Sequence, residues 1–443
     1  MMEDLAFQNN VDSAVSYCYF FGTYCAAYGI KDSIIVLHTP SGCQRRILYL
    51  WSMHDNSNNF KATLSTNLID KDVVFGTENK LVAFVEDTCT RYDGKVVFIL
   101  TSCAPEIVGI DYNLVVPQVK NSSKKIIPIN SPGFRGDFYE GFSDTILETV
   151  KSLPIHKEKY SDKVNIVGYM FSRYEEDENG NIEELKKILD KLDLKVNAVF
   201  FSGDTYRDLE KFSQAKYNII FPYGEKCSKY LKHEVGQENI FCDLPIGLEK
   251  TIDFINHIAS ATQRKETAKI FIKRELSRII PKVQNTIHKM TGKKVAVVSD
   301  WQSIKSLLPM ILEFGMEPVL IGIYNSNLNE SKEKILDLIG ENSTLQYEPI
   351  VIEACTRGQI KETLKDNYVD FCIGSSIESR DLDELGIPTL EYSLPLFEKH
   401  YNFNSPTLGF DGVLNISTQI FNLLNKKALR RESVIKKLES LKK

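Results

Sequence analysis

The stretch Ser33–Cys43, SIIVLHTPSGC, indicates how this chain folds. Its opening run SIIVL is short, apolar and β-branched, as expected of a buried strand, and the proline and glycine that follow favour a tight turn. A second run of this kind, Lys95–Leu100 (KVVFIL), is followed by Thr101-Ser-Cys103. In open α/β sheets, ligands gather beyond the carboxyl ends of the strands. We therefore expect Cys43 and Cys103 to share one edge of a sheet.

Predicted strands and helices alternate along nearly the whole chain. Lys125–Pro128 is a further strand of the first block, a second block begins with the strand Lys163–Val167, and a third begins with Lys293–Ser299. Alternation at this spacing is typical of parallel sheets with helices on both faces. The predicted fold class is therefore α/β, with three Rossmann-like domains, each a parallel sheet flanked by helices, and a C-terminal helical tail.

The predicted domain boundaries follow these blocks. Residues 1–160 form the N-terminal Rossmann-like domain, which contains Cys43 and Cys103. Residues 161–290 form the second Rossmann-like domain and include a helical connector, and residues 291–390 form the third. Residues 391–443 are a C-terminal tail that could pack back on the first domain.

Composition excludes several classes of protein. The chain has 443 residues, of which 43% are apolar and 26% charged, as in a globular protein with more than one core. Its net charge of −5 gives no basic surface for nucleic acid. No apolar run reaches the roughly 20 residues that a membrane-spanning helix needs, and the opening MMEDLAFQNN does not resemble a signal peptide. We expect a cytoplasmic protein that binds neither nucleic acid nor membrane.

Nine cysteines in such a protein are more typical of metal ligands, nucleophiles or small buried residues than of disulfides. Cys18 precedes a predicted helix, Phe20–Tyr28, that leads into the first strand, so it joins Cys43 and Cys103 as a candidate ligand. Thiolates without accompanying carboxylates favour an iron–sulfur cluster over hard cations. On position alone, three ordinary buried cysteines remain the alternative.

Several motifs together resemble the β-subunit branch of the nitrogenase component 1 family. They occur in the family's order over nearly all of the chain: CYFFGTYCAAYGI (18–30), HTPSGC (38–43), DVVFGT (72–77), TSCAPEIVGID (101–111), NSPGF (130–134), GIP (386–388), PLFEKH (395–400) and LGFDG (408–412). Two positions depart from the usual pattern, since Thr77 replaces a glycine and Ile110 replaces an acidic residue. This order of motifs is specific to the family.

The resemblance implies that Cys18, Cys43 and Cys103 are cofactor-binding residues that bind the metal of an iron–sulfur cluster. Three thiolates are one short of the four that a cubane uses, so a partner subunit is expected to complete the site. The cluster would be an [8Fe–7S] P-type cluster or a [4Fe–4S] cluster shared with that partner. The partner would be a homologous α-type subunit or a second copy of this chain.

The same resemblance implies a nitrogenase-like oxidoreductase subunit that relays electrons. An ATP-dependent iron protein, acting as reductase, would supply low-potential electrons, and the chain would pass them on for substrate reduction. In α subunits of the family, a cysteine of the second domain holds a heterometal cofactor. Tyr223 and Gly224 stand there in this sequence, so we expect that this chain does not hold that cofactor by itself. Its catalytic residues and substrate stay unassigned.

Three other functions remain open. Within the family, the chain could be a scaffold on which a nitrogenase metal cofactor is assembled, or a subunit of a tetrapyrrole reductase. From another class, it could be a non-redox protein that binds a small molecule between Rossmann-like domains. Iron content separates the last alternative from the others.

Overall fold

The structure is a computed structural model that describes residues 18–440 except 58–60, 121, 325–331, 341–344 and 346. The side chains of residues 113, 332–333 and 427–440 also lie outside the description. The described residues form two compact units: residues 18–182 with 189–242, and residues 183–188 with those from 243 onward. The first 17 residues of the predicted N-terminal domain lie outside the described residues. The predicted domain boundaries stay predictions.

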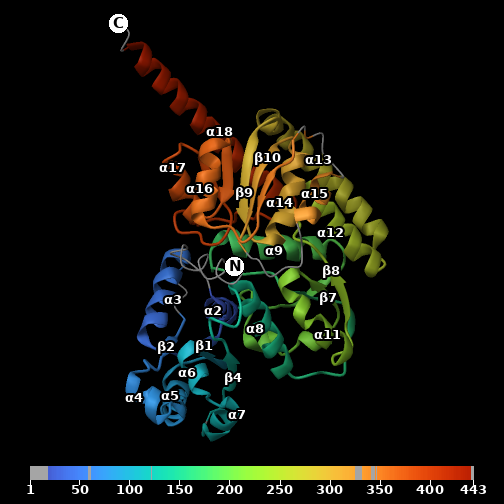
Figure 1. The fold of residues 1–443 in the computed structure, drawn as a ribbon. Helices are drawn as coiled ribbons and strands as arrows, with labels where there is room; N and C mark the ends of the chain where they lie inside the picture. The colour runs from blue at the N-terminus through green and yellow to red at the C-terminus, as the bar shows by residue number, and fades with distance from the viewer. Residues whose placement is uncertain are drawn as a thin grey trace. The chain divides into compact units, whose positions relative to one another are not determined.

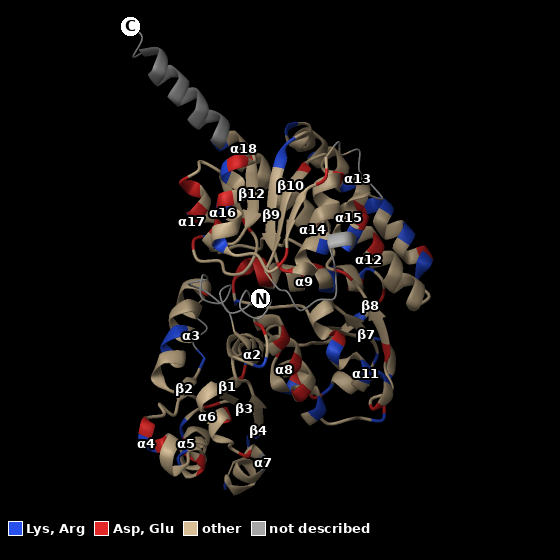
Figure 2. Cartoon of the chain, in the orientation of Figure 1, with Lys and Arg blue, Asp and Glu red and all other residues tan. Residues whose placement is uncertain are grey.

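Three parallel sheets confirm the predicted α/β class (Figure 1). The strand orders are β2-β1-β3-β4 and β6-β5-β7-β8 in the first unit and β11-β10-β9-β12-β13 in the second. Neighbouring strands run parallel in each sheet. Charged residues gather on the helices and leave most of each strand uncharged (Figure 2). This distribution is expected of sheets that are covered on both faces.

The first sheet positions the candidate site. Its strands are β1 (Ser33–His38), β2 (Thr63–Ser65), β3 (Val96–Thr101) and β4 (Lys125–Asn130). β1 and β3 are buried along their whole length, which accounts for their continuous apolar runs. Leu81 and Val85 of helix α5 (Glu78–Arg91) belong to the core on one face. Helices α2 (Tyr19–Tyr28) and α8 (Phe138–Ser152) contact the sheet as well.

Helix α2 is buried at every one of its residues. It crosses α8 at two glycines: a Cβ on Gly22 would lie 1.8 Å from the carbonyl oxygen of Phe138, and one on Gly141 would lie 2.1 Å from that of Tyr19. No side chain fits at either position, because these carbonyl oxygens belong to the facing backbone. This close crossing fixes the start of α2, which directly follows Cys18.

The second sheet of the same unit contains β5 (Tyr160–Val167), β6 (Lys195–Val199), β7 (Ala215–Ile220) and β8 (Glu238–Phe241). Helix α9 spans Glu176–Asp190 and α11 spans Glu225–His233. The helix between β5 and β6 begins at Glu176. Its first turn contains three acidic residues, Glu176, Asp177 and Glu178, so the apolar periodicity typical of a helix begins only further along the sequence.

A charged cluster lies just before and within the first turn of α9. Arg173 is fully buried and forms an ion pair with Asp177. Glu178 accepts hydrogen bonds from the hydroxyl groups of Tyr169 and Ser172. Burial of its carboxyl group raises the pKa of Glu178 from 4.5 to about 7, and the neighbouring Asp177 contributes to the rise.

The second unit is built on the third sheet. Its strands are β9 (Lys294–Ser299), β10 (Glu317–Ile323), β11 (Ile350–Ile352), β12 (Phe371–Gly374) and β13 (Thr389–Glu391). Two helices, α14 (Trp301–Glu313) and α15 (Lys332–Gly340), lie to one side of the sheet, and α16 (Arg357–Asp366) and α17 (Ser376–Asp383) lie to the other (Figure 1). The arrangement is that of a doubly wound sheet.

Three long helices complete this unit: α12 (Leu248–Ala261), α13 (Lys265–Met290) and α18 (Gly409–Ser440). The connector predicted at residues 262–290 is thus helical. Phe410 of the C-terminal tail is fully buried and packs edge-on against Phe271 of α13, with ring centroids 5.9 Å apart. No helix among the described residues is long and apolar enough to cross a membrane.

Candidate functional site

The candidate site lies at the carboxyl edge of the first sheet. His38, the last residue of β1, pairs with Thr101 at the end of β3, and Thr101 pairs with Asn130 at the end of β4. The three strands therefore end level with one another. Cys43, Cys103 and Gly133 come shortly after these ends, as predicted for the two cysteines.

Cys18 lies at the N-cap of α2. Its backbone is extended, its carbonyl oxygen accepts a hydrogen bond from the N–H of Phe21 at 2.9 Å, and it forms an isolated bridge to Asp137. Asp137 caps α8 by accepting a hydrogen bond from the N–H of Glu140 at 2.9 Å. Cys18 is thus held between the starts of two helices. Its side chain is nevertheless exposed.

Cys43 lies in the first turn of α3 (Ser41–His54), within the stretch where the sequence predicted a tight turn. The helix exposes Cys43 and buries one apolar face that includes Ile47, Leu50 and Trp51. Trp51 packs edge-on against two rings of α2, Tyr24 at 5.2 Å and Tyr28 at 4.7 Å. This contact holds α3, and with it Cys43, against the helix that carries Cys18.

Cys103 is the first residue of the short helix α6 (Cys103–Val108) and lies beside Gly133. The N–H of Gly133 donates a hydrogen bond to Sγ of Cys103 at 3.1 Å. A Cβ on Gly133 would lie 3.3 Å from that sulfur and 3.4 Å from Sγ of Cys18. The structure thus brings the sulfurs of Cys18 and Cys103 to the same position beside one glycine.

Cys43 interacts electrostatically with Cys18. Cys18 is exposed as a residue, but the protein atoms around its sulfur partly desolvate it, which raises the pKa of Cys18 above its ordinary value of 9.0; the Cys43 thiol raises it further. The N–H groups of Phe21 and Phe20 and the cation of Arg46 act in the opposite direction. Because iron binds the thiolate, these donors and the cation would assist ligation by Cys18.

Two buried hydroxyl groups beside the cysteines have no hydrogen-bond partner among the described residues. They belong to Thr39, which directly follows β1, and to Ser102, which precedes Cys103. An unpaired buried hydroxyl costs about 1–3 kcal/mol. A bound group with acceptor atoms, such as the sulfides of a cluster, would satisfy such donors.

The donor set fits an iron–sulfur cluster better than a single metal ion. Within the described ranges, no three His, Cys, Asp or Glu side chains converge to hold one ion. A cluster does not require such convergence, because each cysteine binds a different iron. All nine cysteines are free thiols, so the three at this edge are available as ligands.

The position at which α subunits of the family have a cysteine is filled in this chain. Tyr223 is buried and stacks on Tyr139, with ring centroids 5.3 Å apart. A Cβ on Gly224 would lie 2.8 Å from the carbonyl oxygen of Val167. Cys227 is also buried, and its thiol donates to the carbonyl oxygen of Gly224 at 3.0 Å.

An exposed apolar surface lies on the two short helices α4 (Asp70–Phe75) and α6, which contact each other. We call it the α4–α6 patch and define it by six residues: Ile69, Val73, Val74, Phe75, Ile107 and Val108. Val74, Phe75 and Ile107 are each more than two-thirds exposed, at 73%, 79% and 75%. Cys103 starts α6, so the patch adjoins the cysteine edge. Contiguous exposed apolar surface of this kind marks interaction sites.

Gly133, Thr39 and Ser102 were not singled out by the sequence. Gly133 lies in the NSPGF motif, which was noted only as a resemblance, and its contribution here is the lack of a side chain. The hydroxyl groups of Thr39 and Ser102 are distinguished only because they are buried and have no hydrogen-bond partner among the described residues. No local sequence pattern marks these three residues, because what distinguishes them depends on packing between distant segments.

Comparison with known proteins identifies the class of protein. A family model described as nitrogenase component 1 type oxidoreductase matches residues 18–425. The chain belongs to this family of oxidoreductases. Among similar proteins is the nitrogenase iron-iron protein beta chain of Rhodobacter capsulatus, 23% identical, with 92% of each chain covered. The nitrogenase molybdenum-iron protein beta chain of Frankia alni is 24% identical, with 92% of this chain and 81% of that one covered.

The fold agrees with this assignment. The solved structure of nitrogenase Cp1 at pH 6.5 superimposes with a TM-score of 0.84 and 20% identity. The match covers 94% of this chain and 93% of that chain. The nitrogenase vanadium-iron protein beta chain of Trichormus variabilis is as similar in sequence as the other two relatives, at 23% identity. Sequence identity therefore does not distinguish between the iron-iron, vanadium-iron and molybdenum-iron relatives.

Proposed function

We propose that this chain is an electron-relay subunit of a nitrogenase-like oxidoreductase, in which Cys18, Cys43 and Cys103 hold an iron–sulfur cluster. The observation that carries the proposal is that the sulfurs of Cys18 and Cys103 both lie beside Gly133, whose N–H is directed at the sulfur of Cys103. An iron–sulfur cluster, when bound, accepts and returns single electrons at low potential. The chain supplies thiolate ligands, and Gly133, Thr39 and Ser102 supply hydrogen-bond donors that tune the potential.

The proposal includes a partner that covers the cysteine edge. Cys18 and Cys43 are exposed, and three thiolates do not complete a cubane, so the missing ligand comes from a second subunit. The partner is a homologous α-type subunit or a second copy of this chain, and the shared cluster is [8Fe–7S] or [4Fe–4S]. The α4–α6 patch supports this part of the proposal, because a partner would bury it. An ATP-dependent iron protein is the proposed electron donor.

Substrate reduction is assigned to the partner or to a cavity shared with it. Support comes from Tyr223 and Gly224, since a side chain at Gly224 would collide with the backbone at Val167. We expect no stoichiometric molybdenum or vanadium in the chain purified alone, measured by plasma mass spectrometry. Stoichiometric heterometal in the isolated chain would contradict this assignment.

The ligand assignment is tested with cysteine variants purified under anaerobic conditions. Cys18→Ala, Cys43→Ala and Cys103→Ala should each lower iron content and the brown absorbance near ~400 nm that thiolate-bound iron gives. Each variant removes one of only three thiolates, so each loss should be large.

Cys89→Ala and Cys372→Ala are the matched controls, because these cysteines lie in a helix and a strand away from the site. They should retain the iron of the unmodified protein. Equal loss of iron in both sets would overturn the ligand assignment. An iron-free protein with no absorbance would instead favour a small-molecule-binding function.

A further inference from the structure

The positive charge of Arg46 acts on two of the three candidate ligands. Arg46 follows Cys43 by three residues in α3, and residues three apart on a helix are neighbours on its surface. Its charge also acts on the sulfur of Cys18, at the start of helix α2. Arg46 is exposed, as both of these cysteines are. An exposed cation is therefore part of the cysteine edge.

The backbone at this edge contributes positive charge as well. Cys18 is the N-cap of α2, and the N–H groups of Phe20 and Phe21 form hydrogen bonds to its sulfur. Cys43 lies in the first turn of α3, a helix of 14 residues. The N-terminus of an α-helix carries a partial positive charge that favours anions. The fold fixes the field of these two helices, whereas the charge of Arg46 belongs to one side chain that can be exchanged.

Other charged groups at this edge are held by hydrogen bonds within the fold. Arg135, two residues after Gly133, donates to the carbonyl oxygen of Asn130 at 3.1 Å. The carboxylate of Glu106 on α6 accepts a hydrogen bond from the hydroxyl group of Thr101. The cation whose charge reaches the sulfur of Cys18 belongs to α3 instead.

We propose that Arg46 sets the reduction potential of the cluster and keeps it reducible once a partner covers the cysteine edge. The inference rests on the proposed function. Reduction adds one electron and changes no bond to the chain, so the reduced state carries one more negative charge. The guanidinium group of Arg46 attracts that charge and thereby raises the reduction potential. Net charge and exposure to solvent are among the factors that set the potentials of iron–sulfur clusters.

A partner at the cysteine edge makes this attraction more important. Water stabilises added negative charge, so the exclusion of water by itself lowers the reduction potential. The same exclusion strengthens the attraction between Arg46 and the added charge, because the interaction energy rises as the dielectric constant falls. Arg46 therefore offsets the effect of burial, and the assembled protein still accepts an electron.

A series of charges at position 46 tests the proposal in protein purified anaerobically with its cluster and its native partner. Arg46→Gln should lower the ratio of reduced to oxidised cluster at a fixed potential about tenfold, which is about 59 mV for a one-electron couple. Arg46→Glu should lower the ratio further, and Arg46→Lys should keep the potential of the unmodified protein. Spectroelectrochemical titration, with dithionite as the reductant, measures all four proteins.

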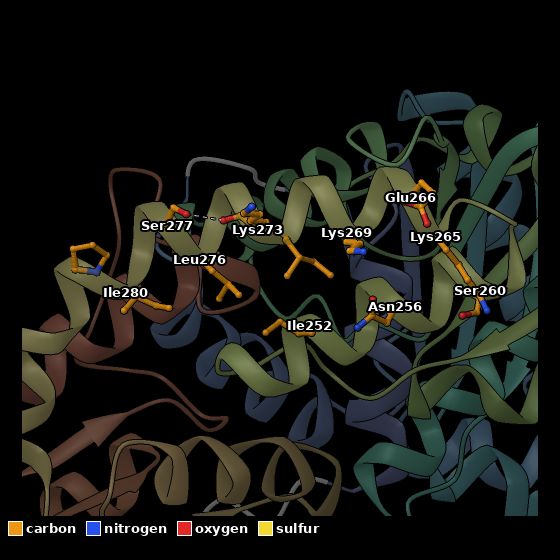
Figure 3. A pocket seen from close by; sticks show the side chains of 12 residues that line it. Ile252, Asn256, Ser260, Lys265, Glu266, Lys269, Lys273, Leu276, Ser277 and Ile280 are labelled. Carbon is orange, nitrogen blue, oxygen red and sulfur yellow. Dashed lines mark hydrogen bonds between the residues drawn. The ribbon is translucent and has the colours of Figure 1, made fainter.

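Arg45→Gln is the matched control. Arg45 is also exposed on α3 (Figure 2), but it follows Cys43 by two residues, and residues two apart on a helix do not face each other. This variant removes the same charge from the same helix and should shift the potential far less. Lys269→Gln is a second control, because Lys269 lies on α13 in the second unit, along a groove between α12 and α13 (Figure 3).

Ionic strength gives a readout that a purely structural role of Arg46 would not change. Salt screens exposed charges over a distance of about 8 Å at physiological ionic strength. In the chain without its partner, the shift caused by Arg46→Gln should therefore shrink as salt is added. In the assembled protein the shift should be larger and should depend little on salt.

Four results separate this inference from the proposed function. Equal potentials in Arg46→Gln, Arg46→Glu and the unmodified protein, each with full iron, would overturn the inference alone. Equal shifts in Arg45→Gln and Arg46→Gln would overturn it too, because general surface charge would then set the potential. Loss of iron in Arg46→Gln would contradict it by showing that Arg46 retains the cluster. An unmodified protein without iron would overturn the proposed function itself.

Discussion

Gly133 shows how a missing side chain can shape a site. Its φ angle is not in the left-handed region, so its backbone does not require glycine. The requirement comes from its neighbours, since a Cβ would lie 3.3–3.4 Å from the sulfurs of Cys103 and Cys18. In the protein without a cluster, the two sulfurs can rotate away from an added methyl group, and only the contact with Cβ of Cys18 at 3.3 Å is left. When the two sulfurs are bound to iron, they cannot move away from the added methyl group.

This difference leads to a prediction for Gly133→Ala. We expect cluster affinity to fall by about 1–3 kcal/mol, the usual cost of an extra methyl in a packed site, while the metal-free protein unfolds at the temperature of the unmodified one. Iron titration and differential scanning calorimetry measure the two effects separately.

Gly358→Ala is the control, because the nearest atom to its Cβ would be 3.9 Å away, the hydroxyl oxygen of Thr356. It should retain full iron affinity. If Gly133→Ala also retains iron at limiting concentration, the cluster does not hold both sulfurs beside this glycine.

The sequence predicted the part of the site that has distinctive chemistry. Cys43 and Cys103 could be selected because a thiolate after a strand suggests a ligand, and Cys18 because it precedes a helix that leads into the first strand. Ser102 and Thr39 could not, because serine and threonine are common after strands and only burial without a partner distinguishes them. That property depends on packing between distant segments, which no local pattern contains.

At the scale of elements, the start of α9 couples stability to pH. The pKa of Glu178 is raised in the folded protein from 4.5 to about 7. Between these values the folded state keeps a proton that the unfolded chain has released, so the free energy of unfolding falls as pH rises. Below pH 4.5, Glu178 is protonated in both states and does not change the free energy of unfolding with pH. Above pH 7 it is ionised in both states, and the decrease in the free energy of unfolding is complete.

Glu178→Gln should remove this loss. We expect the variant to gain on the order of 2–3 kcal/mol in unfolding free energy above pH 7 relative to the unmodified protein, and little at pH 4.5. Urea unfolding at a series of pH values measures the difference. A gain that is the same at every pH would show that Glu178 does not titrate in this window.

The elements that the sequence missed are short or begin at an unusual place. The strand β2 has only three residues at the edge of its sheet, too few for a periodicity. Helix α3 starts directly after Pro40, so the residues that suggested a turn in fact begin a helix. The long buried strands β1, β3 and β9 were predicted, because parallel strands covered on both faces produce continuous apolar runs.

At the scale of the whole molecule, the exposed α4–α6 patch predicts that the protein works as an assembly. Val74→Glu with Phe75→Glu should weaken association with the partner at least about tenfold, because two charges would enter an apolar contact. Anaerobic size exclusion with light scattering measures the assembly, and iron analysis should show reduced occupancy in the dissociated fraction. A monomer that keeps a full, stable cluster would contradict the shared site.

The full burial of α2 bears on the order in which the protein matures. Because the helix is enclosed in the folded unit, Cys18 is in its final position once this unit has folded. Cys18 and Cys43 still face solvent at that stage. Preassembled iron and sulfide can therefore be inserted into the finished fold from outside, and this entrance closes when the partner subunit docks. On our proposal, a maturation factor that delivers the cluster has to act between these two events.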